Sequence, residues 1–342
     1  MTTQQLILLS FERGYHVGWR SPQPIIDHIT LLRALISMSH TTRVNKCADL
    51  IINGKLSTTA LLPTAKCIEG KLKLLTIFPR LPVVGKASGV QRLLTTLTAV
   101  IHIVKYTSEC VKNNGRVFVT PIINMVKLEC LGVQGIKPLE LPVKKGVVLK
   151  DVKEQSAIEP LGSLFEVFEM ITEYRNRIDR LSGAADVFQV YGYKPRTPLW
   201  LALIGENEAV KCAIEQLEIL QVLGIGGLRS RGWGKFTVIR DVSICDEDLE
   251  VLKNYLGWSI DYNYLLGFMT PGTWVDSDRS YALKITITGR AGPSHNAYKL
   301  PVLEVMDIGS LVYAKKHPQP FTLSLSNNSA VIVFNPVVLH AH

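Results

Sequence analysis

Twelve residues carry the clearest signal in the chain: Gly224-Ile225-Gly226-Gly227-Leu228-Arg229-Ser230-Arg231-Gly232-Trp233-Gly234-Lys235. Glycine reaches backbone conformations with positive φ and lets a second backbone approach closely. Successive peptide N–H groups in such a turn form a concave anion site, and arginine grips a phosphate through two hydrogen bonds. We therefore predict a phosphate-binding loop that is shaped by Gly226, Gly227, Gly232 and Gly234 and whose contacts come from Arg229, Ser230, Arg231 and Lys235.

The loop is predicted to follow a helix and to precede a strand. Val187–Tyr193 and Leu199–Ile204 have the composition of two strands. Apolar residues then repeat at helical spacing from Asn207, a suitable N-cap, to the glycine at 224, and Phe236–Ile239 predicts the next strand. The order strand, strand, helix, loop, strand is that of the second half of a ferredoxin-like βαββαβ unit.

This order excludes two familiar nucleotide loops. The spacing is not that of an ATP-binding P-loop, and a dinucleotide fingerprint requires a strand before the loop and a helix after it. Two alternatives stay open at this stage. The loop could be a tight connection with solvated arginines, and Trp233 could either stack on a base or fill the core.

The N-terminal part supplies the first half of such a unit. Leu6–Phe11 predicts a buried strand, and a glycine- and proline-containing loop leads to a helix predicted at His28–Met38. The apolar face of this helix would consist of Ile29, Leu32, Leu35 and Ile36.

The middle of the chain has weaker patterns. Lys55–Pro82 is predicted to be irregular, and Gln91–Lys105 is either a helix or buried extended chain. Val117–Thr120 predicts a strand and Phe165–Tyr174 a short helix. Glycines, prolines and the pair Lys144-Lys145 predict a projecting hairpin near residues 126–150.

The chain becomes rich in predicted strands after Asp241. Strand candidates are Tyr281–Thr288, Phe321–Leu325 and Ala330–Phe334, and one helix is predicted at Glu247–Tyr255. We therefore predict an α+β protein with two domains. Residues 1–240 form a ferredoxin-like domain with an inserted hairpin, and residues 241–342 form a smaller β-rich domain.

Composition indicates a globular protein, and its basic charge leaves two alternatives open: a solvated surface without a partner, or a polyanionic partner. Hydrophobic residues make up 47% of the 342 residues, and the net charge is +9. No secretory signal and no apolar run of membrane-spanning length are visible, so we expect a cytoplasmic protein. The six cysteines lack C-x-x-C pairs and zinc spacing, so we expect unpaired thiols and no metal or other cofactor.

Three segments resemble the RAMP superfamily of CRISPR-associated proteins. The glycine loop is similar to that superfamily's glycine-rich signature. Asn176–Ala185 (NRIDRLSGAA) resembles its mid-chain N-R-I-x-R-x-[ST]-G-x-A segment, and His16-Val17-Gly18 with Ile26–Leu35 resembles its first strand–loop–helix. The tail from Tyr298 to Tyr313 resembles the fourth Csm subunit (Cas-five group) of type III-A effector complexes, and the type III-D counterpart is a close relative.

The resemblance implies a ferredoxin-like, RRM-related fold that binds the 5′ repeat-derived tag of a guide RNA. It also implies contacts with the large polymerase-like subunit and with a backbone subunit. A hairpin thumb that wedges between nucleotides is expected, and residues 126–150 are the candidate. Further RNA-contact candidates are Arg177, Arg180, Ser182, His16, Arg33, Lys144 and Lys145.

No catalytic residue is expected. In the related backbone subunits that cut target RNA, an aspartate lies in the first helix, where this chain has Ile29, which can neither bind a metal nor transfer a proton. The rival interpretation is a Cas6-like endoribonuclease, another RAMP protein, with His16, His28 or His40 as its base. A scaffold or small-anion-binding protein is a third possibility, which no second phosphate or metal motif supports.

Overall fold

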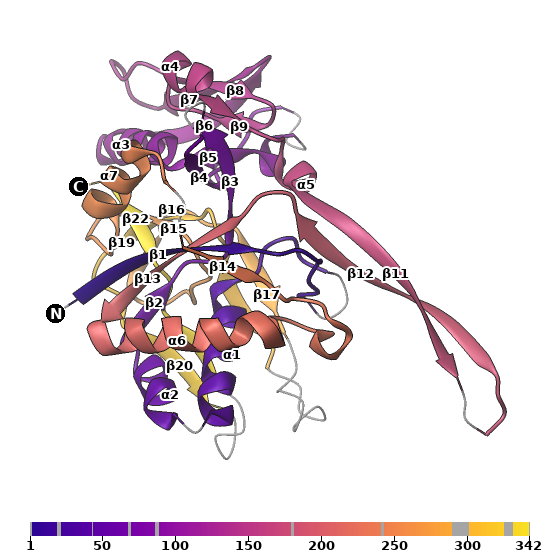
Figure 1. Cartoon of the computed structure of the whole chain (residues 1–342). Coiled ribbons are helices and arrows are strands. Elements are labelled where there is room, and N and C mark those ends of the chain that lie inside the picture. Colours follow the sequence, from indigo (N-terminus) through magenta and orange to yellow (C-terminus); the bar gives the residue numbers. More distant parts are fainter. Residues whose placement is uncertain are drawn as a thin grey trace.

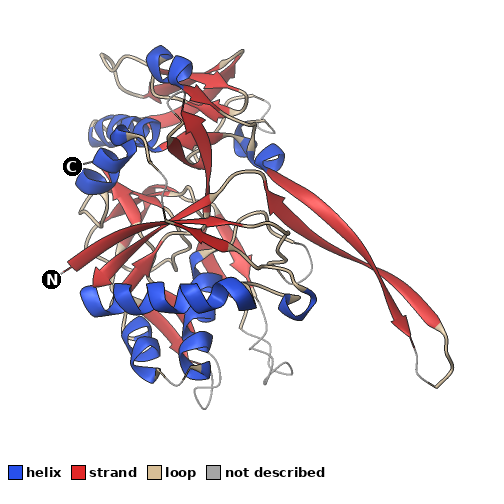
Figure 2. Cartoon of the chain, viewed as in Figure 1, coloured by secondary structure: helices blue, strands red, loops and turns tan. Residues whose placement is uncertain are grey.

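The structure is a computed structural model, and it describes residues 2–18, 22–42, 44–67, 70–85, 89–178, 181–240, 243–288, 301–324 and 331–341. Strands and helices are mixed along the chain, as Figure 2 shows. The prediction of an α+β fold is therefore confirmed.

A ferredoxin-like unit forms the centre of the molecule. Its strands are β1 (Thr2–Ser10), β2 (Leu56–Thr58), β3 (Leu62–Cys67), β13 (Leu199–Glu206) and β14 (Thr237–Ile239). The order β14-β1-β13-β3 is antiparallel throughout, and β2 also pairs with β13. The helices α1 (His28–Thr41) and α6 (Asn207–Leu223) pack against each other on the same side of these strands (Figure 1). This is the predicted βαββαβ arrangement.

Local sequence explains both helices. The Asp27 side chain caps α1 by accepting a hydrogen bond from the Thr30 backbone N–H at 2.8 Å, and the four predicted apolar residues of this helix are all buried. Helix α6 ends at Gly224, whose φ is +82°, as predicted. Its N-cap is Glu206, one residue before the predicted Asn207, and no side chain caps it.

The central sheet continues into an upper lobe. From β3 it runs through β4 (Leu72–Ile77), β5 (Leu94–Thr96), β9 (Val147–Val148), β8 (Leu139–Lys144), β7 (Met125–Leu131) and β6 (Arg116–Ile122), and β10 (Ile158–Glu159) pairs with β3. The helical elements between these strands are η1 (Val90–Arg92), α3 (Leu97–Lys112) and α4 (Val152–Ala157), whereas α2 (Asn45–Ile52) precedes β2 and packs against α1 and α6.

The structure corrects one prediction for this region and resolves the alternatives of another. Lys55–Pro82 is not irregular, because it contains β2, β3 and β4. These strands are buried on both faces, so their residues lack the alternation that marks a half-exposed strand. Gln91–Lys105 contains both predicted alternatives, since the extended strand β5 is followed directly by the helix α3. The strand at Val117–Thr120 is confirmed as part of β6.

The projecting hairpin lies elsewhere than predicted. Residues 126–150 do contain the paired strands β7 and β8, but Val126, Leu128 and Leu141 are buried within the upper lobe. The element that extends from the body in Figure 1 is β11 (Phe168–Ile178) paired with β12 (Ala185–Pro195). The short helix predicted at Phe165–Tyr174 is therefore correct only within α5 (Leu164–Val167). The rest of that range is wrong, because it belongs to β11.

The C-terminal third is β-rich, as predicted. Helix α7 (Asp246–Tyr255) precedes β15 (Tyr262–Leu265), β16 (Val275–Tyr281), β17 (Lys284–Ile287), β18 (Leu303–Met306), β19 (Leu311–Ala314), β20 (Phe321–Ser324), β21 (Val331–Phe334) and β22 (Val338–His340). Four of these strands form a sheet in the order β16-β19-β15-β22. Tyr264 and Leu339 belong to the same hydrophobic core as Leu9, Leu35 and Trp200, so both parts of the chain share one interior.

The cysteines are paired, contrary to the expectation of free thiols. Cys47–Cys212 joins α2 to α6, Cys67–Cys245 joins the end of β3 to the start of α7, and Cys110–Cys130 joins α3 to β7. The partners are 165, 178 and 20 residues apart, and such spacings do not reveal a pairing before the fold is known.

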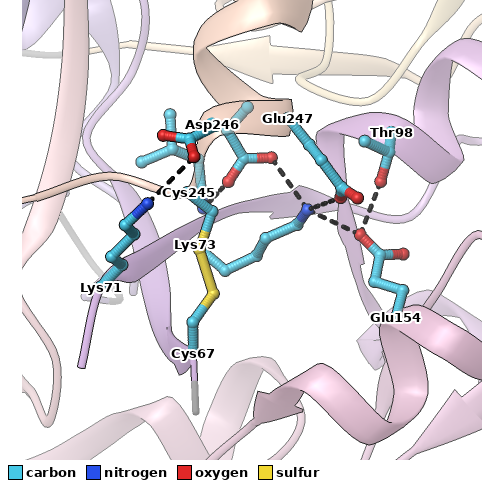
Figure 3. Close-up of a disulfide and its surroundings, with 10 residues drawn as sticks. Cys67, Lys71, Lys73, Thr98, Glu154, Cys245, Asp246 and Glu247 are labelled. Atoms are coloured by element: carbon cyan, nitrogen blue, oxygen red, sulfur yellow. Dashed lines mark hydrogen bonds and ion pairs between the residues drawn. A yellow bond between two sulfur atoms is a disulfide. The ribbon is translucent and has the colours of Figure 1, made fainter. Parts of the chain in front are cut away.

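An ion cluster centred on the buried Lys73 lies beside the Cys67–Cys245 disulfide (Figure 3). Lys73 is 1% exposed, and its Nζ lies 2.8 Å from Glu154 Oε1, 2.9 Å from Glu247 Oε2 and 3.4 Å from Asp248 Oδ1. Glu154 also accepts hydrogen bonds from the hydroxyls of Thr96 and Thr98. The cluster connects β4 to the first turn of α7 and to α4, so it joins three parts of the chain.

Candidate nucleic-acid interface

The glycine loop folds back on itself. The Ile225 N–H donates to the Gly234 carbonyl at 2.9 Å, and the Gly234 N–H donates to the Gly14 carbonyl at 3.0 Å. A side chain at Gly234 would overlap the carbonyl oxygen of Ile225, and φ here is +75°, so this position requires glycine. The loop thus follows α6 and precedes β14, as predicted, and closes tightly.

The loop also joins the segment that follows β1. The Gly227 N–H donates to the His16 carbonyl at 2.7 Å, and a Cβ on Gly226 would lie 2.6 Å from that same oxygen. His16 Nδ1 lies 2.6 Å from the carbonyl oxygen of Tyr191, which can only accept, so this nitrogen carries a proton. His16 therefore connects the glycine loop to the base of the β11–β12 hairpin.

The tryptophan of the loop is part of the core. Trp233 is 2% exposed, and a Cβ on Gly192 of β12 would collide with its ring. Tyr15 and Tyr193 pair across the same region, with backbone hydrogen bonds of 2.9 and 3.0 Å. Trp233 thus fills the space under the loop, and its alternative role as an exposed stacking surface is excluded.

The polar side chains of the loop face outward. Ser230, Arg231 and Lys235 are exposed and Arg229 is half-buried. Within the described part of the chain, no carboxylate forms an ion pair with Arg229, Arg231 or Lys235. The Arg231 guanidinium lies over the Phe188 ring, 5.5 Å from its centroid. The loop therefore presents three positive charges that no described carboxylate neutralises, which suits binding of a polyanion.

One face of the hairpin continues this surface. Arg175 is opposite Phe188 in the strand pairing, and the exposed Arg177 follows on the same face, opposite Asp186. The Arg175 guanidinium pairs with Glu173. Arg177, predicted from the sequence, is thus aligned with the glycine loop. Arg175 and Phe188 were not among the predicted residues, although alternation along the two strands was a usable signal.

The opposite face of the hairpin exposes apolar side chains, with the polar Thr172, Asn176 and Gln189 among them. It carries Met170, Tyr174, Ile178, Val187 and Tyr191, all exposed. Because successive strand residues point to opposite faces, the hairpin separates its arginines from these apolar side chains. We call this the apolar hairpin face.

The other predicted residues are not gathered at the loop. Ser182 lies between the two hairpin strands and is exposed, whereas Arg180 lies outside the described residues. Arg33 is half-buried in α1, where burial lowers the pKa of its guanidinium and Asp27 opposes the shift. The Lys144 ammonium donates to the carbonyls of Gln155 and Ile158 at 2.8 Å each. Lys145, exposed in the β8–β9 turn, is also in the upper lobe, away from the loop (Figure 1).

Neither a metal cluster nor a membrane segment is found in the described ranges. They contain no group of three or more histidine, cysteine or acidic side chains arranged to hold a metal ion. Among the same residues, no helix combines the length and the apolar character needed to cross a bilayer.

The chain is similar to solved structures but to no known sequence family. No protein-family model matches the chain, and no curated protein is similar to it in sequence. A chain in the crystal structure of the Csm3–Csm4 subcomplex of the type III-A CRISPR–Cas interference complex matches with a TM-score of 0.54 at 14% identity, over 98% of both chains. The chain has the fold of a type III subunit.

Structures of type III-B Cmr-beta are also similar. One, with cognate target RNA and AMPPnP, has a TM-score of 0.45 at 8% identity and covers 91% of this chain and 86% of that chain. Another, with cognate target RNA, has a TM-score of 0.35 at 14% identity and covers 69% of this chain and 96% of that chain. The fold comparison rests on the type III-A structure, which supports the predicted ferredoxin-like fold.

Proposed function

We propose that this chain is a non-catalytic, cytoplasmic subunit of a type III CRISPR–Cas effector complex. It binds the 5′ repeat-derived tag of the guide RNA and bridges the large subunit to the backbone, in the manner of the fourth Csm subunit. The observation that carries the proposal is the set of unpaired cations on the glycine loop. These lie at the base of a projecting hairpin, on a fold that a type III-A subunit shares.

Phosphate binding accounts for the charges. Among the described residues, no carboxylate forms an ion pair with Arg229, Arg231 or Lys235, and single-stranded RNA supplies a regular series of phosphates. The Arg231–Phe188 stack fixes one guanidinium in place, so less side-chain freedom is lost when it binds. The exposed Tyr174 and Tyr191 rings on the apolar hairpin face offer flat surfaces for bases or for a neighbouring subunit.

The surroundings of the first helix support a binding role without catalysis. Ile29 is 5% exposed and belongs to a second hydrophobic cluster with Leu265 and Phe334, so its side chain faces the interior. Both carboxylate oxygens of Asp27 accept hydrogen bonds from Thr30. Burial lowers the pKa of His28 to about 3, which makes it a poor proton shuttle near neutral pH.

We expect no cleavage of precursor guide RNA or of target RNA by this chain alone. The assay incubates the purified full chain with each labelled RNA, with and without Mg²⁺, and resolves the products on a denaturing gel. His16→Ala and His40→Ala variants are run in parallel. Specific products that disappear in either variant would contradict the proposal and favour the Cas6-like endoribonuclease.

Assembly is expected to depend on the apolar hairpin face. Replacing Met170, Tyr174 and Ile178 by serine removes three exposed apolar side chains without emptying the core, so the fold should persist. In co-expression with the large and backbone subunits and a guide RNA, we expect the full chain to co-purify with both subunits and the variant to recover much less of them.

The control for this experiment replaces three exposed apolar residues elsewhere, Leu161, Val222 and Leu249. The control variant should co-purify like the original chain. A full chain that binds guide RNA but recovers neither subunit would contradict the bridging role and leave a solitary RNA-binding protein.

A further inference from the structure

A cavity of about 290 Å³ lies directly beside the glycine loop. It is formed where the segment after β1 meets the end of the loop and the start of β14. The residues that line it are Glu12, Arg13, Gly232, Lys235, Phe236 and Thr237. Only Gly232 and Lys235 were candidates from the sequence. Glu12 and Arg13 are more than 200 positions away along the chain, and only the fold brings them to the loop.

Two cationic side chains, Arg13 and Lys235, line the cavity and can bind an anionic ligand. Arg13 approaches the loop where Gly232 has no side chain, and its Nη1 lies 3.3 Å from the position that a Cβ would occupy. Gly232 has a φ of +84°, a conformation that further favours glycine. Across the described residues, neither Arg13 nor Lys235 is in an ion pair with a carboxylate. Two unpaired cations flanking one cavity form a suitable site for a phosphate.

The remaining lining does not suit a bare phosphate. Glu12 contributes a carboxylate, which repels an anion but accepts hydrogen bonds from hydroxyl and amino groups. Thr237 is exposed and carries a hydroxyl, and the buried Phe236 supplies an apolar wall. A ligand that satisfies all of these groups has an anionic part, hydroxyl groups and an apolar part. One nucleotide of a nucleic acid has this combination, and the cavity is close to the smallest volume usual for ligand sites, about 300 Å³.

We infer that this cavity holds a single nucleotide of the bound strand, with Arg13 and Lys235 on its phosphate and Glu12 accepting a hydrogen bond from its ribose 2′-hydroxyl. The inference rests on the proposed RNA-binding function and adds a chemical preference to it. DNA lacks the 2′-hydroxyl, so the Glu12 carboxylate would face a deoxyribose without a donor and would still repel the neighbouring phosphate. The site therefore selects RNA over DNA of the same sequence.

The test measures the affinity of the full chain for a single-stranded RNA that carries the repeat-derived tag, for its DNA counterpart, and for a set of RNAs each with one 2′-deoxy nucleotide. The original chain is expected to bind RNA more tightly than DNA and to lose affinity at one deoxy position. Glu12→Ala should lower the RNA-to-DNA affinity ratio by about tenfold, the effect of about one charge-assisted hydrogen bond. The affinity of this variant should no longer depend on the 2′-hydroxyl at that deoxy position.

Arg13→Gln has a different expected signature. It should weaken RNA and DNA binding by the same factor and reduce the slope of log affinity against log salt by about 0.7, the contribution of one phosphate on a single strand. Glu250→Gln and Arg116→Gln, both exposed on other elements, are the matched controls and should change neither quantity.

The outcomes separate this inference from the proposed function. If the original chain binds RNA and Glu12→Ala keeps its affinity ratio and its deoxy sensitivity, the nucleotide site is wrong while the RNA-binding function stands. An Arg13→Gln variant with unchanged affinity and salt slope would likewise overturn it. If the original chain binds no RNA at any salt concentration, the proposed function fails and this inference with it.

Discussion

Reversing the charges of Arg229, Arg231 and Lys235 to glutamate is expected to weaken the binding of single-stranded RNA by at least about a hundredfold. Hydrogen bonds to charged groups contribute about 1.5–3 kcal/mol each, and each substitution also adds repulsion toward a phosphate. The three side chains lie outside the core, and no carboxylate in the described ranges depends on them, so the loss should be specific to binding.

The salt dependence gives a second readout of the same variant. Three phosphate contacts on a single strand contribute about 2 to the slope of log affinity against log salt, and this part should disappear. A control that reverses the exposed Lys137, Lys153 and Lys253 has the same change in net charge at positions on other elements. If both variants lose affinity equally, net charge alone explains the binding, and the glycine loop is not the site.

Replacing Lys73 by methionine is expected to lower the free energy of unfolding by about 3–5 kcal/mol, the usual cost of removing one partner from a buried ion pair. Glu154 and Asp248 would remain buried in the cluster without their cation. The matched control is Lys71→Met. Lys71 forms its ion pair with the exposed Asp246, so its loss should cost no more than about 1 kcal/mol. Chemical denaturation of the two variants measures the difference.

The free energy of unfolding of the Lys73→Met variant should change with pH in a direction that tests this account. Burial raises the pKa of Asp248 to about 7, and Lys73 opposes that shift. Because the folded pKa lies above the unfolded value, Asp248 favours folding most at low pH, and this contribution is lost as the pH rises toward 7. Without Lys73 the pKa rises further, so the variant should regain stability when the pH falls from 8 to 6. A deficit that is independent of pH would contradict this account.

Short-range patterns were sufficient to predict several elements. The apolar spacing of α1, the stop of α6 at Gly224 and the order around the glycine loop each depend on neighbouring residues, and each was confirmed. The strands β2, β3 and β4 were missed because burial on both faces removes the alternation by which a strand is recognised. The burial of Lys73 could not be predicted, because lysine is almost always exposed unless it is paired. Its three carboxylate partners come from distant segments that only the fold brings together.

The candidate site was predictable to the same limited extent. The glycines and cations of the loop lie within one twelve-residue segment, so they could be proposed as a site from the sequence. Arg13 at the loop and the neighbouring His16–Tyr191 contact each join segments more than 170 residues apart, and no local signal links them. Phe188 is closer in sequence to its partner Arg231, but it lies on a separate element, so no short-range pattern links these two either. The thumb was assigned to residues 126–150 from composition. The true projecting element carries exposed apolar side chains at alternate positions, a pattern that looks like a core strand.

The hairpin is anchored at its base by close packing, since Gly14 leaves room for Ile171 and Gly192 leaves room for Trp233. Beyond this anchor its length is set only by the number of paired residues. The eleven pairs of β11 and β12 extend over about 35 Å at roughly 3.3 Å per residue. Lengthening both strands by two residues would move the tip outward by about 6.6 Å and keep each face in place, whereas one residue in each would exchange the arginine face for the apolar one. The length of the hairpin can therefore change without exchanging its two faces only in steps of two residues per strand, which restricts the positions that its tip can reach relative to the glycine loop.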